Sequence, residues 1–165
     1  MMLRIAGFEP ESMVDGLGVR FTLFLQGCGF RCPGCHNQET WDGNKGTLIS
    51  DKTIYELIKA NPLLSGVTLS GGEPFLQAFN LIPLVTRLKQ DGYNIWCYTG
   101  FKFEELIGTK SERFKPLLEY IDVLVDGRFE LANKSLDLRF KGSSNQRIIN
   151  VSESLKQGQI ILFPI

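Results

Sequence analysis

The stretch VRFTLFLQGCGFRCPGCHN, residues 19–37, joins an apolar run to three closely spaced cysteines. Residues 19–26 are largely apolar and rich in β-branched and aromatic side chains, which predicts a buried β-strand. This strand would end directly before Cys28, Cys32 and Cys35, and the chain has four cysteines in all. The stretch therefore predicts a strand that delivers a set of thiols to one place.

Further strands are predicted along the chain, and each of the next three runs straight into an unusual loop. They cover residues 66–70, 93–98 and 121–125, and they lead into GGEP, TG and DGR. A last strand is predicted over residues 159–163. Because the carboxyl ends of parallel strands lie at one edge of a sheet, these loops and the cysteine loop are expected to form one site.

Helical periodicity separates the predicted strands. Residues 50–60 fit a helix with Ser50 as its cap and with Ile54, Leu57 and Ile58 on one face.

A second helix is predicted around residues 81–88, where four apolar residues recur at helical spacing. Asn80 would cap it, Pro83 would lie in its first turn and Gly92 would mark its end. A weaker helical pattern covers residues 114–120.

This alternation of strands and helices predicts an α/β fold with a parallel sheet and right-handed crossovers. The helices are too few for a closed eight-stranded barrel, so we expect a partial, open parallel β/α barrel. A length of 165 residues suits a single domain spanning residues 1–165.

Composition narrows the functional classes. Lys plus Arg and Asp plus Glu each number 18, so the basic excess typical of nucleic-acid-binding proteins is missing. Residues 1–12 do not fit a signal peptide, and no run of about 18 apolar residues suggests a membrane span. We therefore expect a cytoplasmic protein without nucleic-acid or membrane partners. In that reducing compartment, clustered cysteines indicate metal binding or catalysis rather than disulfides.

Three thiols at this spacing leave several kinds of site open. A structural zinc normally takes four protein ligands, and Cys97 or His36 could supply the fourth. Cys97, however, lies in an apolar run typical of a core residue. A redox dithiol at Cys32 and Cys35 would leave Cys28 unexplained. A 4Fe-4S cluster held at three of its irons uses all three cysteines and leaves one iron open to an exchangeable ligand.

The spacing Cys28-x3-Cys32-x2-Cys35 resembles the signature of radical S-adenosylmethionine enzymes. In that family, S-adenosylmethionine chelates the open iron, and the reduced cluster cleaves it to a 5′-deoxyadenosyl radical. The resemblance implies two cofactors, a 4Fe-4S cluster with these three cysteines as ligands and S-adenosylmethionine.

Two other strand-end loops resemble parts of that family's cofactor site. Gly71, Gly72 and Glu73 are similar to its GGE segment, which implies contact with the methionine ammonium group. Thr99 resembles the residue that hydrogen-bonds the ribose.

The resemblance extends to the remaining strand end and to the cysteine loop itself. Asp126 and Arg128 resemble the strand-end pair in which a cation meets the methionine carboxylate, a role suited to an arginine. Gly34, His36 and Asn37 are implied to lie near the cofactor, with the backbone of residues 34–36 meeting the adenine edge. Many members carry an aromatic residue at the position of Gly34, so an aromatic wall near the adenine is expected to be missing or to come from His36.

Several longer motifs resemble one branch of the glycyl-radical activases, namely the activating proteins of anaerobic ribonucleoside-triphosphate reductases. They are CPGCHN at 32–37, ETW at 39–41, YTGF at 98–101, VDGRFE at 125–130 and RFKGSSNQRI at 139–148. DGLGVR at residues 15–20 resembles a motif shared among glycyl-radical activases in general. The resemblance covers residues 5–151.

This branch implies two protein partners. The radical would abstract a hydrogen from a glycine in the large subunit of the reductase, and the electron donor would be flavodoxin-like. A polar run is then expected to dock the partner or to close the site, and its residues are Ser143, Ser144, Asn145, Gln146 and Arg147.

Other functions remain open from the sequence. The chain could activate another glycyl-radical enzyme such as pyruvate formate-lyase, although those activases tend to be longer. It could also resemble a small-molecule enzyme of the deazapurine pathway, whose cysteine loop usually carries a long insert. A non-enzymatic module that binds zinc through Cys28, Cys32, Cys35 and either His36 or Cys97 is the alternative from another class.

Overall fold

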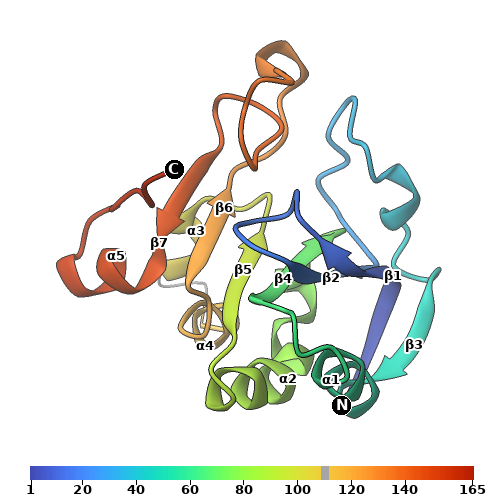
Figure 1. Cartoon of the computed structure of the whole chain (residues 1–165). Coiled ribbons are helices and arrows are strands. Elements are labelled where there is room, and N and C mark those ends of the chain that lie inside the picture. Colours follow the sequence, from blue (N-terminus) through green and yellow to red (C-terminus); the bar gives the residue numbers. More distant parts are fainter. Residues whose placement is uncertain (109–111) are drawn as a thin grey trace.

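The computed structural model describes residues 1–108 and 112–165, which form one seven-stranded sheet with helices packed on it (Figure 1). The strands lie in the order β3-β1-β2-β4-β5-β6-β7. Their bounds are β1 (Met2–Ser12), β2 (Arg20–Leu25), β3 (Thr47–Ser50), β4 (Gly66–Gly71), β5 (Asn94–Tyr98), β6 (Val123–Asp126) and β7 (Arg147–Asn150). Because β3 and β7 are separate edges, the described strands form an open sheet and not a closed barrel.

The centre of the sheet is parallel, as the sequence predicts. β2 pairs with β4, β4 with β5 and β5 with β6, all in the parallel sense. Most of their side chains are buried, which is typical of parallel strands covered on both faces. The carboxyl ends of these four strands therefore lie along one edge, where the sequence places its unusual loops.

Three antiparallel strands extend the sheet beyond what the sequence predicts. β1 pairs with both β2 and β3, and β7 pairs with β6. The prediction of a strand over residues 159–163 is wrong, because this segment forms only an isolated bridge between Leu162 and Ile149. β7 takes the place beside β6 instead, and its four residues are too short to show a period in the sequence.

The helices lie on the sheet and on one another (Figure 1). Their bounds are α1 (Asp51–Lys59), α2 (Ala78–Gln90), α3 (Phe103–Ile107), α4 (Lys115–Leu118) and α5 (Val151–Gln157). Ser50 caps α1 as predicted, since its hydroxyl oxygen accepts a hydrogen bond from the Thr53 N–H at 3.1 Å. Ile54 and Ile58 are buried in the core, whereas Leu57 is 38% exposed and does not belong to the buried face.

Helix α2 begins earlier than predicted, at Ala78, because a 3-10 turn (Pro74–Gln77) leads directly into it. Asn80 is therefore inside the helix and not at its cap, and its amide donates to the Met2 carbonyl at 2.9 Å. Pro83 falls in the second turn, where it removes one helical hydrogen bond. Gly92 follows the helix with a φ of +86°, as a terminating glycine should.

The DGLGVR motif holds the amino ends of the parallel strands together. Arg20 is only 1% exposed, and its guanidinium donates to Thr68 Oγ1 at 2.7 Å and to the Leu17 and Val67 carbonyls at 2.9 Å. Burial lowers the pKa of Arg20 to about 10. Since Arg20 opens β2 and the cysteines follow the end of β2, this motif supports the fold at the end of the sheet away from the cysteine loop.

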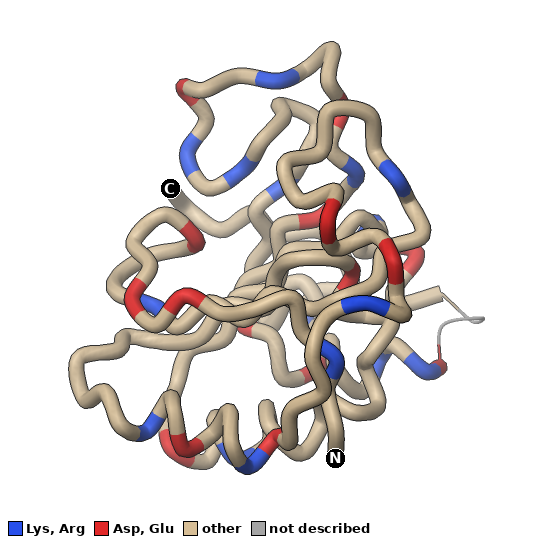
Figure 2. The backbone as a smooth tube through the Cα atoms, turned by 90° about the vertical axis from the view of Figure 1, so that its right-hand side faces the viewer, with Lys and Arg blue, Asp and Glu red and all other residues tan. Residues whose placement is uncertain are grey.

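Charged residues of both signs are spread over the whole fold (Figure 2). No helix in the described part of the chain is both long and apolar enough to cross a membrane.

Candidate functional site

The cysteine loop (residues 27–37) leaves the end of β2 and is fixed at its base by backbone hydrogen bonds. The Gly27 N–H donates to the Thr40 carbonyl at 2.6 Å, and the Cys28 N–H donates to the Trp41 carbonyl at 3.1 Å. Gly27 has a φ of +106°, a conformation that favours glycine. The loop therefore starts from a rigid point at the edge of the sheet.

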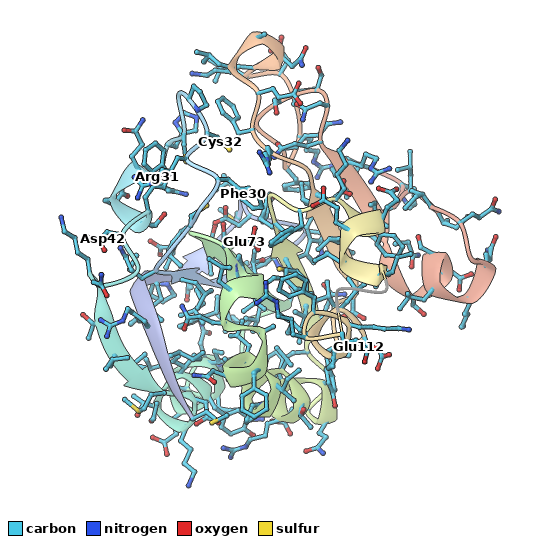
Figure 3. The ribbon with its side chains drawn as sticks, turned by 180° about the vertical axis from the view of Figure 1, so that it is seen from behind. Phe30, Arg31, Cys32, Asp42, Glu73 and Glu112 are labelled. Atoms are coloured by element: carbon cyan, nitrogen blue, oxygen red, sulfur yellow. The ribbon has the colours of Figure 1, made fainter. Side chains whose placement is uncertain are left out.

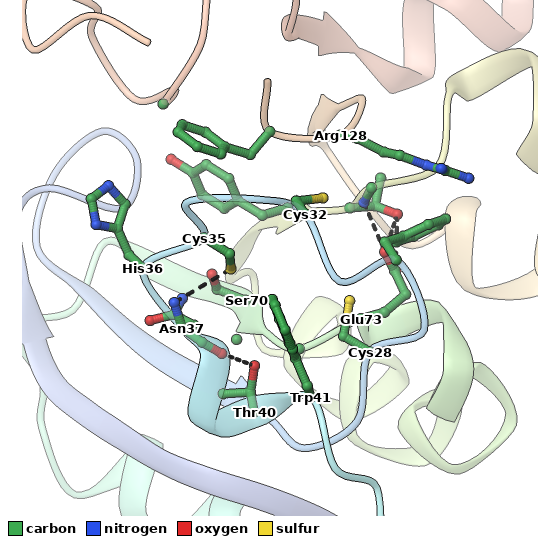
Figure 4. A pocket seen from close by; sticks show the side chains of 18 of the residues that line it. Cys28, Cys32, Cys35, His36, Asn37, Thr40, Trp41, Ser70, Glu73 and Arg128 are labelled. Carbon is green, nitrogen blue, oxygen red and sulfur yellow. Dashed lines mark hydrogen bonds between the residues drawn. The ribbon is translucent and has the colours of Figure 1, made fainter. Parts of the chain in front are cut away.

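Cys28, Cys32 and Cys35 are free, half-buried thiols that line one cavity of about 210 Å³ (Figure 4). The Asn37 N–H donates to Cys35 Sγ at 3.4 Å. Burial raises the pKa of the Cys28 and Cys32 thiols, and the nearby Arg128 charge acts against this rise at Cys32.

Across the described residues, no three His, Cys, Asp or Glu side chains are placed to hold a single metal ion. Soft thiols spread over a cavity wall, with a backbone donor to sulfur, fit a 4Fe-4S cluster.

The two candidate fourth ligands lie in different surroundings. Cys97 is fully buried in the hydrophobic core between the sheet and the helices. His36 is exposed and its ring centroid lies 6.0 Å from that of Phe129. His36, Asn37 and Cys35 share the cavity lining, whereas Cys97 belongs to the core as its apolar neighbours indicate.

The GGE loop after β4 is pressed against the base of the cysteine loop. A Cβ atom at Gly71 would lie 2.5 Å from the Leu25 nitrogen, and one at Gly72 would lie 2.3 Å from the Gly27 oxygen. The Glu73 N–H donates to that same Gly27 oxygen at 2.7 Å. Both glycines are needed, because a side chain at Gly71 would meet the backbone of β2 and one at Gly72 would meet the base of the cysteine loop.

Glu73 is 1% exposed, and its carboxylate ties the ends of β4 and β5 together. It accepts hydrogen bonds from the Thr99 hydroxyl at 2.9 Å, the Gly100 N–H at 2.7 Å and the Phe75 N–H at 3.0 Å. Burial raises the pKa of Glu73 to about 7, although these donors oppose the rise. Glu73, which Figure 4 shows at the cavity, and Thr99 both line it, so the structure brings together two of the residues that the sequence assigned to the cofactor.

Asp126 and Arg128, which the sequence treats as one pair, have different partners in the structure. Asp126 is 1% exposed and accepts from Arg147 Nε at 3.1 Å and Arg147 Nη2 at 2.6 Å. The Arg147 guanidinium also bonds Glu104 at 2.9 Å, and these partners raise the pKa of Arg147. Arg128 instead borders the cavity with the thiols, and its guanidinium lies 4.4 Å from the centre of the Phe30 ring.

The polar run Ser143, Ser144, Asn145, Gln146 and Arg147, here named the closing segment, is bonded mainly to the strand end beside it. Ser143 is fully buried, and Gln146 donates to the Gly127 carbonyl at 3.0 Å while accepting from the Gly142 N–H at 2.9 Å. Asn145 donates to the Arg128 carbonyl at 2.8 Å, and its Oδ1 is buried without a hydrogen-bond partner among the described residues. Ser144 is the exposed member. These bonds hold the segment against the loop that follows β6. Whether it docks the partner or closes the site stays a prediction.

The cavity also has aromatic walls to which the sequence assigned no role. Phe30, Trp41, Tyr98 and Phe129 line it. All four residues fall within stretches already quoted, but a sequence motif does not tell in which direction an aromatic ring points. A Cβ atom at Gly34 would lie 2.9 Å from a Leu131 methyl and 3.4 Å from the Phe129 ring. Side chains that follow β6 therefore pack against Gly34, where the sequence predicted an aromatic wall that is either missing or supplied by His36.

A comparison with solved structures finds a likeness in fold. The crystal structure of QueE from Escherichia coli superposes with a TM-score of 0.50 and is 21% identical in sequence. The match covers 61% of this chain and 53% of that one.

Comparison with protein families and curated relatives gives a more specific result. A family model described as a 4Fe-4S single cluster domain matches residues 14–149. Three relatives are each named anaerobic ribonucleoside-triphosphate reductase-activating protein. The protein from Haemophilus influenzae is 37% identical over 149 residues, covering 86% of this chain and 94% of the relative. The protein from Vibrio cholerae is 39% identical with the same two coverages, and that from Enterobacteria phage T4 is 34% identical over 84% and 88%. The chain belongs to the family of anaerobic ribonucleoside-triphosphate reductase-activating proteins.

Proposed function

We propose that this chain activates an anaerobic ribonucleoside-triphosphate reductase by generating a glycyl radical in its large subunit. When bound, a 4Fe-4S cluster and S-adenosylmethionine supply a 5′-deoxyadenosyl radical that takes a hydrogen atom from the partner's glycine. The observation that carries the proposal is the set of three free thiols on one cavity in a chain of this family. Beside them lies Arg128, which has no ion pair with a carboxylate among the described residues.

The residues around the cavity divide the binding task. Cys28, Cys32 and Cys35 would hold the cluster and leave one iron open. The Arg128 guanidinium would bind the methionine carboxylate through its fork of N–H donors.

The GGE loop and the end of β5 would bind the rest of the methionine and the ribose. Gly71 and Gly72 bring backbone groups to the cavity wall, and the Glu73 carboxylate is the negative charge available to an ammonium group. Thr99 is the group proposed for the ribose, and its hydroxyl already donates to Glu73. Ligand binding would therefore have to extend or exchange this hydrogen bond.

The adenine would lie against the other end of the cysteine loop. Gly34, His36 and Asn37 are exposed or half-buried there, so the loop backbone is accessible to a flat base. Asp126 acts indirectly, because its carboxylate holds Arg147 and so fixes the strand end that carries Arg128.

The open sheet would serve as a partial β/α barrel within a single domain, with the cavity that the thiols line turned to the partner. Its parallel centre and the fold likeness to QueE support this. The partner's glycine must reach the cavity, and the closing segment borders that opening through Gln146. A flavodoxin-like protein would supply the electron, and the cytoplasm is the compartment that suits free thiols.

The proposal is tested by mixing the anaerobically reconstituted protein with the large reductase subunit, dithionite and S-adenosylmethionine. Electron paramagnetic resonance should then show a protein-based glycyl radical. The matched control is a large subunit whose radical-bearing glycine is replaced by alanine, which should show none. A wild-type mixture without the radical signal, despite a loaded cluster, would overturn the proposed partner.

A further inference from the structure

Arg128 carries a positive charge that the described residues leave without a counterion. No ion pair within residues 1–108 and 112–165 involves it, whereas the nearby Arg147 is paired with both Asp126 and Glu104. The contact of the Arg128 guanidinium is the Phe30 ring, with 4.4 Å between Cζ and the ring centroid. Phe30 and Arg128 both line the cavity that holds the thiols.

The Phe30 ring is itself held in place from the sheet side. Phe101 meets it edge to face, with centroids 4.9 Å apart and an interplanar angle of 76°. A Cβ atom at Gly100 would lie 2.5 Å from the Phe30 ring, so the ring sits in the space that this glycine leaves. Figure 3 shows Phe30 above Glu73 and on the same end of the sheet as Cys32. The ring is therefore a fixed support between the cysteine loop and the end of β5.

A guanidinium group has two different surfaces, a flat face and a donor edge, and the Phe30 ring lies 4.4 Å from Arg128 Cζ. Its face is attracted to the electron-rich face of an aromatic ring. Its edge carries five N–H donors that match a carboxylate in a planar, bidentate contact. An arginine stacked on a ring thus keeps its donors free, and it has already lost much of the side-chain freedom that binding would otherwise remove.

We propose that Phe30 is a positioning residue, which holds the Arg128 guanidinium by its face so that the donor edge receives the carboxylate of S-adenosylmethionine. This inference rests on the proposed function, in which Arg128 binds that carboxylate. Phe30 then acts through Arg128 and needs no contact with the ligand.

The test is a double-mutant cycle on anaerobically reconstituted protein. Phe30→Leu removes the ring and keeps an apolar side chain, Phe30→Tyr keeps the ring, and each is made with and without Arg128→Ala. Iron and sulfide contents are measured first, and the dissociation constant for S-adenosylmethionine is then measured by anaerobic titration calorimetry. A role in the loop structure alone would change the iron content and would not depend on Arg128.

We expect Phe30→Leu to raise the dissociation constant about three- to tenfold with unchanged iron, and Phe30→Tyr to stay within about twofold of wild type. In the Arg128→Ala background, Phe30→Leu should cause no further change. Wild-type affinity in Phe30→Leu would overturn the inference. An equal loss with and without Arg128 would also overturn it, because the ring would then act on its own.

A structure of the wild-type protein with S-adenosylmethionine provides a second test that needs no variant. Arg128 should remain on the Phe30 ring while it bonds the carboxylate, and an Arg128 that has left the ring would overturn the inference. The proposed function fails separately, through a loaded wild-type protein that does not bind S-adenosylmethionine or an Arg128→Ala variant that binds it normally.

Discussion

The cysteine loop and the closing segment border the same cavity, but they use their polar groups in opposite ways. The loop presents three free thiols to the cavity, and its hydrogen bonds are made mostly by the backbone. The side chains of the closing segment are bonded to neighbouring residues. Gln146 forms hydrogen bonds with Gly127 and Gly142, and Arg147 forms an ion pair with Asp126. One region thus keeps its chemistry available to a ligand, while the other fixes the wall of the site.

The two arginines at the site repeat this difference. Arg147 places its donors on two carboxylates, one of them fully buried, so its charge is used within the fold. Arg128 lies over the Phe30 ring, and its guanidinium forms no ion pair within the part of the chain that the structure describes. Both arginines lie beside the end of β6. We nevertheless expect replacement of Arg147 to change mainly the stability, and replacement of Arg128 to change mainly the ligand affinity.

The largest effect should come from the thiols. Cys28→Ala, Cys32→Ala and Cys35→Ala are each expected to abolish assembly of the 4Fe-4S cluster, because two thiolates cannot replace three. The matched control is Cys97→Ala, which lies in the core and should retain the cluster. Iron and acid-labile sulfide analysis after anaerobic reconstitution checks this, and a loss of iron confined to the Cys97 variant would contradict the ligand assignment.

Glu73 should give the protein a pH-dependent stability. Its folded pKa of about 7 lies above the ordinary value of 4.5, so its contribution is fully present below about pH 4.5 and is lost as pH rises to about 7. The stability of the cluster-free wild type relative to Glu73→Gln should therefore fall by roughly 3 kcal/mol across that range.

Urea unfolding at several pH values measures this difference. Glu119→Gln, at an exposed glutamate, is the matched control and should show no such trend. A wild-type advantage over Glu73→Gln that stays constant between pH 4.5 and 7 would show that the buried carboxylate does not titrate there.

Arg147→Ala should chiefly reduce stability. It leaves the Asp126 carboxylate buried without its cation, and we expect a loss of roughly 2–3 kcal/mol after allowance for the solvent exposure of Arg147. The measurement is the free energy of unfolding in urea, with Arg128→Ala as the matched variant that should lose less than about 0.5 kcal/mol. Equal losses would remove the distinction between the two arginines.

Arg128→Ala should chiefly reduce ligand affinity. A charge-assisted hydrogen bond to a carboxylate is worth about 1.5–3 kcal/mol, so the dissociation constant for S-adenosylmethionine should rise about tenfold or more. The iron content should match that of the wild type. If the variant binds S-adenosylmethionine with unchanged affinity at full iron content, Arg128 does not bind the ligand and is only a solvated charge on the loop.

The parallel centre of the fold is readable from the sequence because its buried strands are continuous apolar runs that end at glycine-rich loops. β1 was not predicted because a half-exposed strand has no comparable run. β3 and β7 were not predicted because at most two residues in each of them are buried. The start of α2 was placed too late because Asn80 has the side chain of a cap, while a tertiary contact with Met2 uses it instead.

The site could be predicted in its residues but not in its pairings. Spacing alone indicated Cys28, Cys32 and Cys35, whereas the Asp126–Arg147 ion pair joins two strand ends distant in sequence, which only the fold brings together. The same holds for the ring of Phe30 beneath Arg128. The roles that we assign to these residues in binding the cofactors remain predictions.

The most direct test of the central claim is anaerobic reconstitution with iron and sulfide, followed by dithionite and S-adenosylmethionine and an assay for 5′-deoxyadenosine. We expect about four iron and four sulfide per chain, brown absorbance, and formation of 5′-deoxyadenosine that depends on Cys28, Cys32 and Cys35. A colourless protein that binds one zinc and forms no 5′-deoxyadenosine would contradict it, and the chain would then be a metal-binding module without radical chemistry.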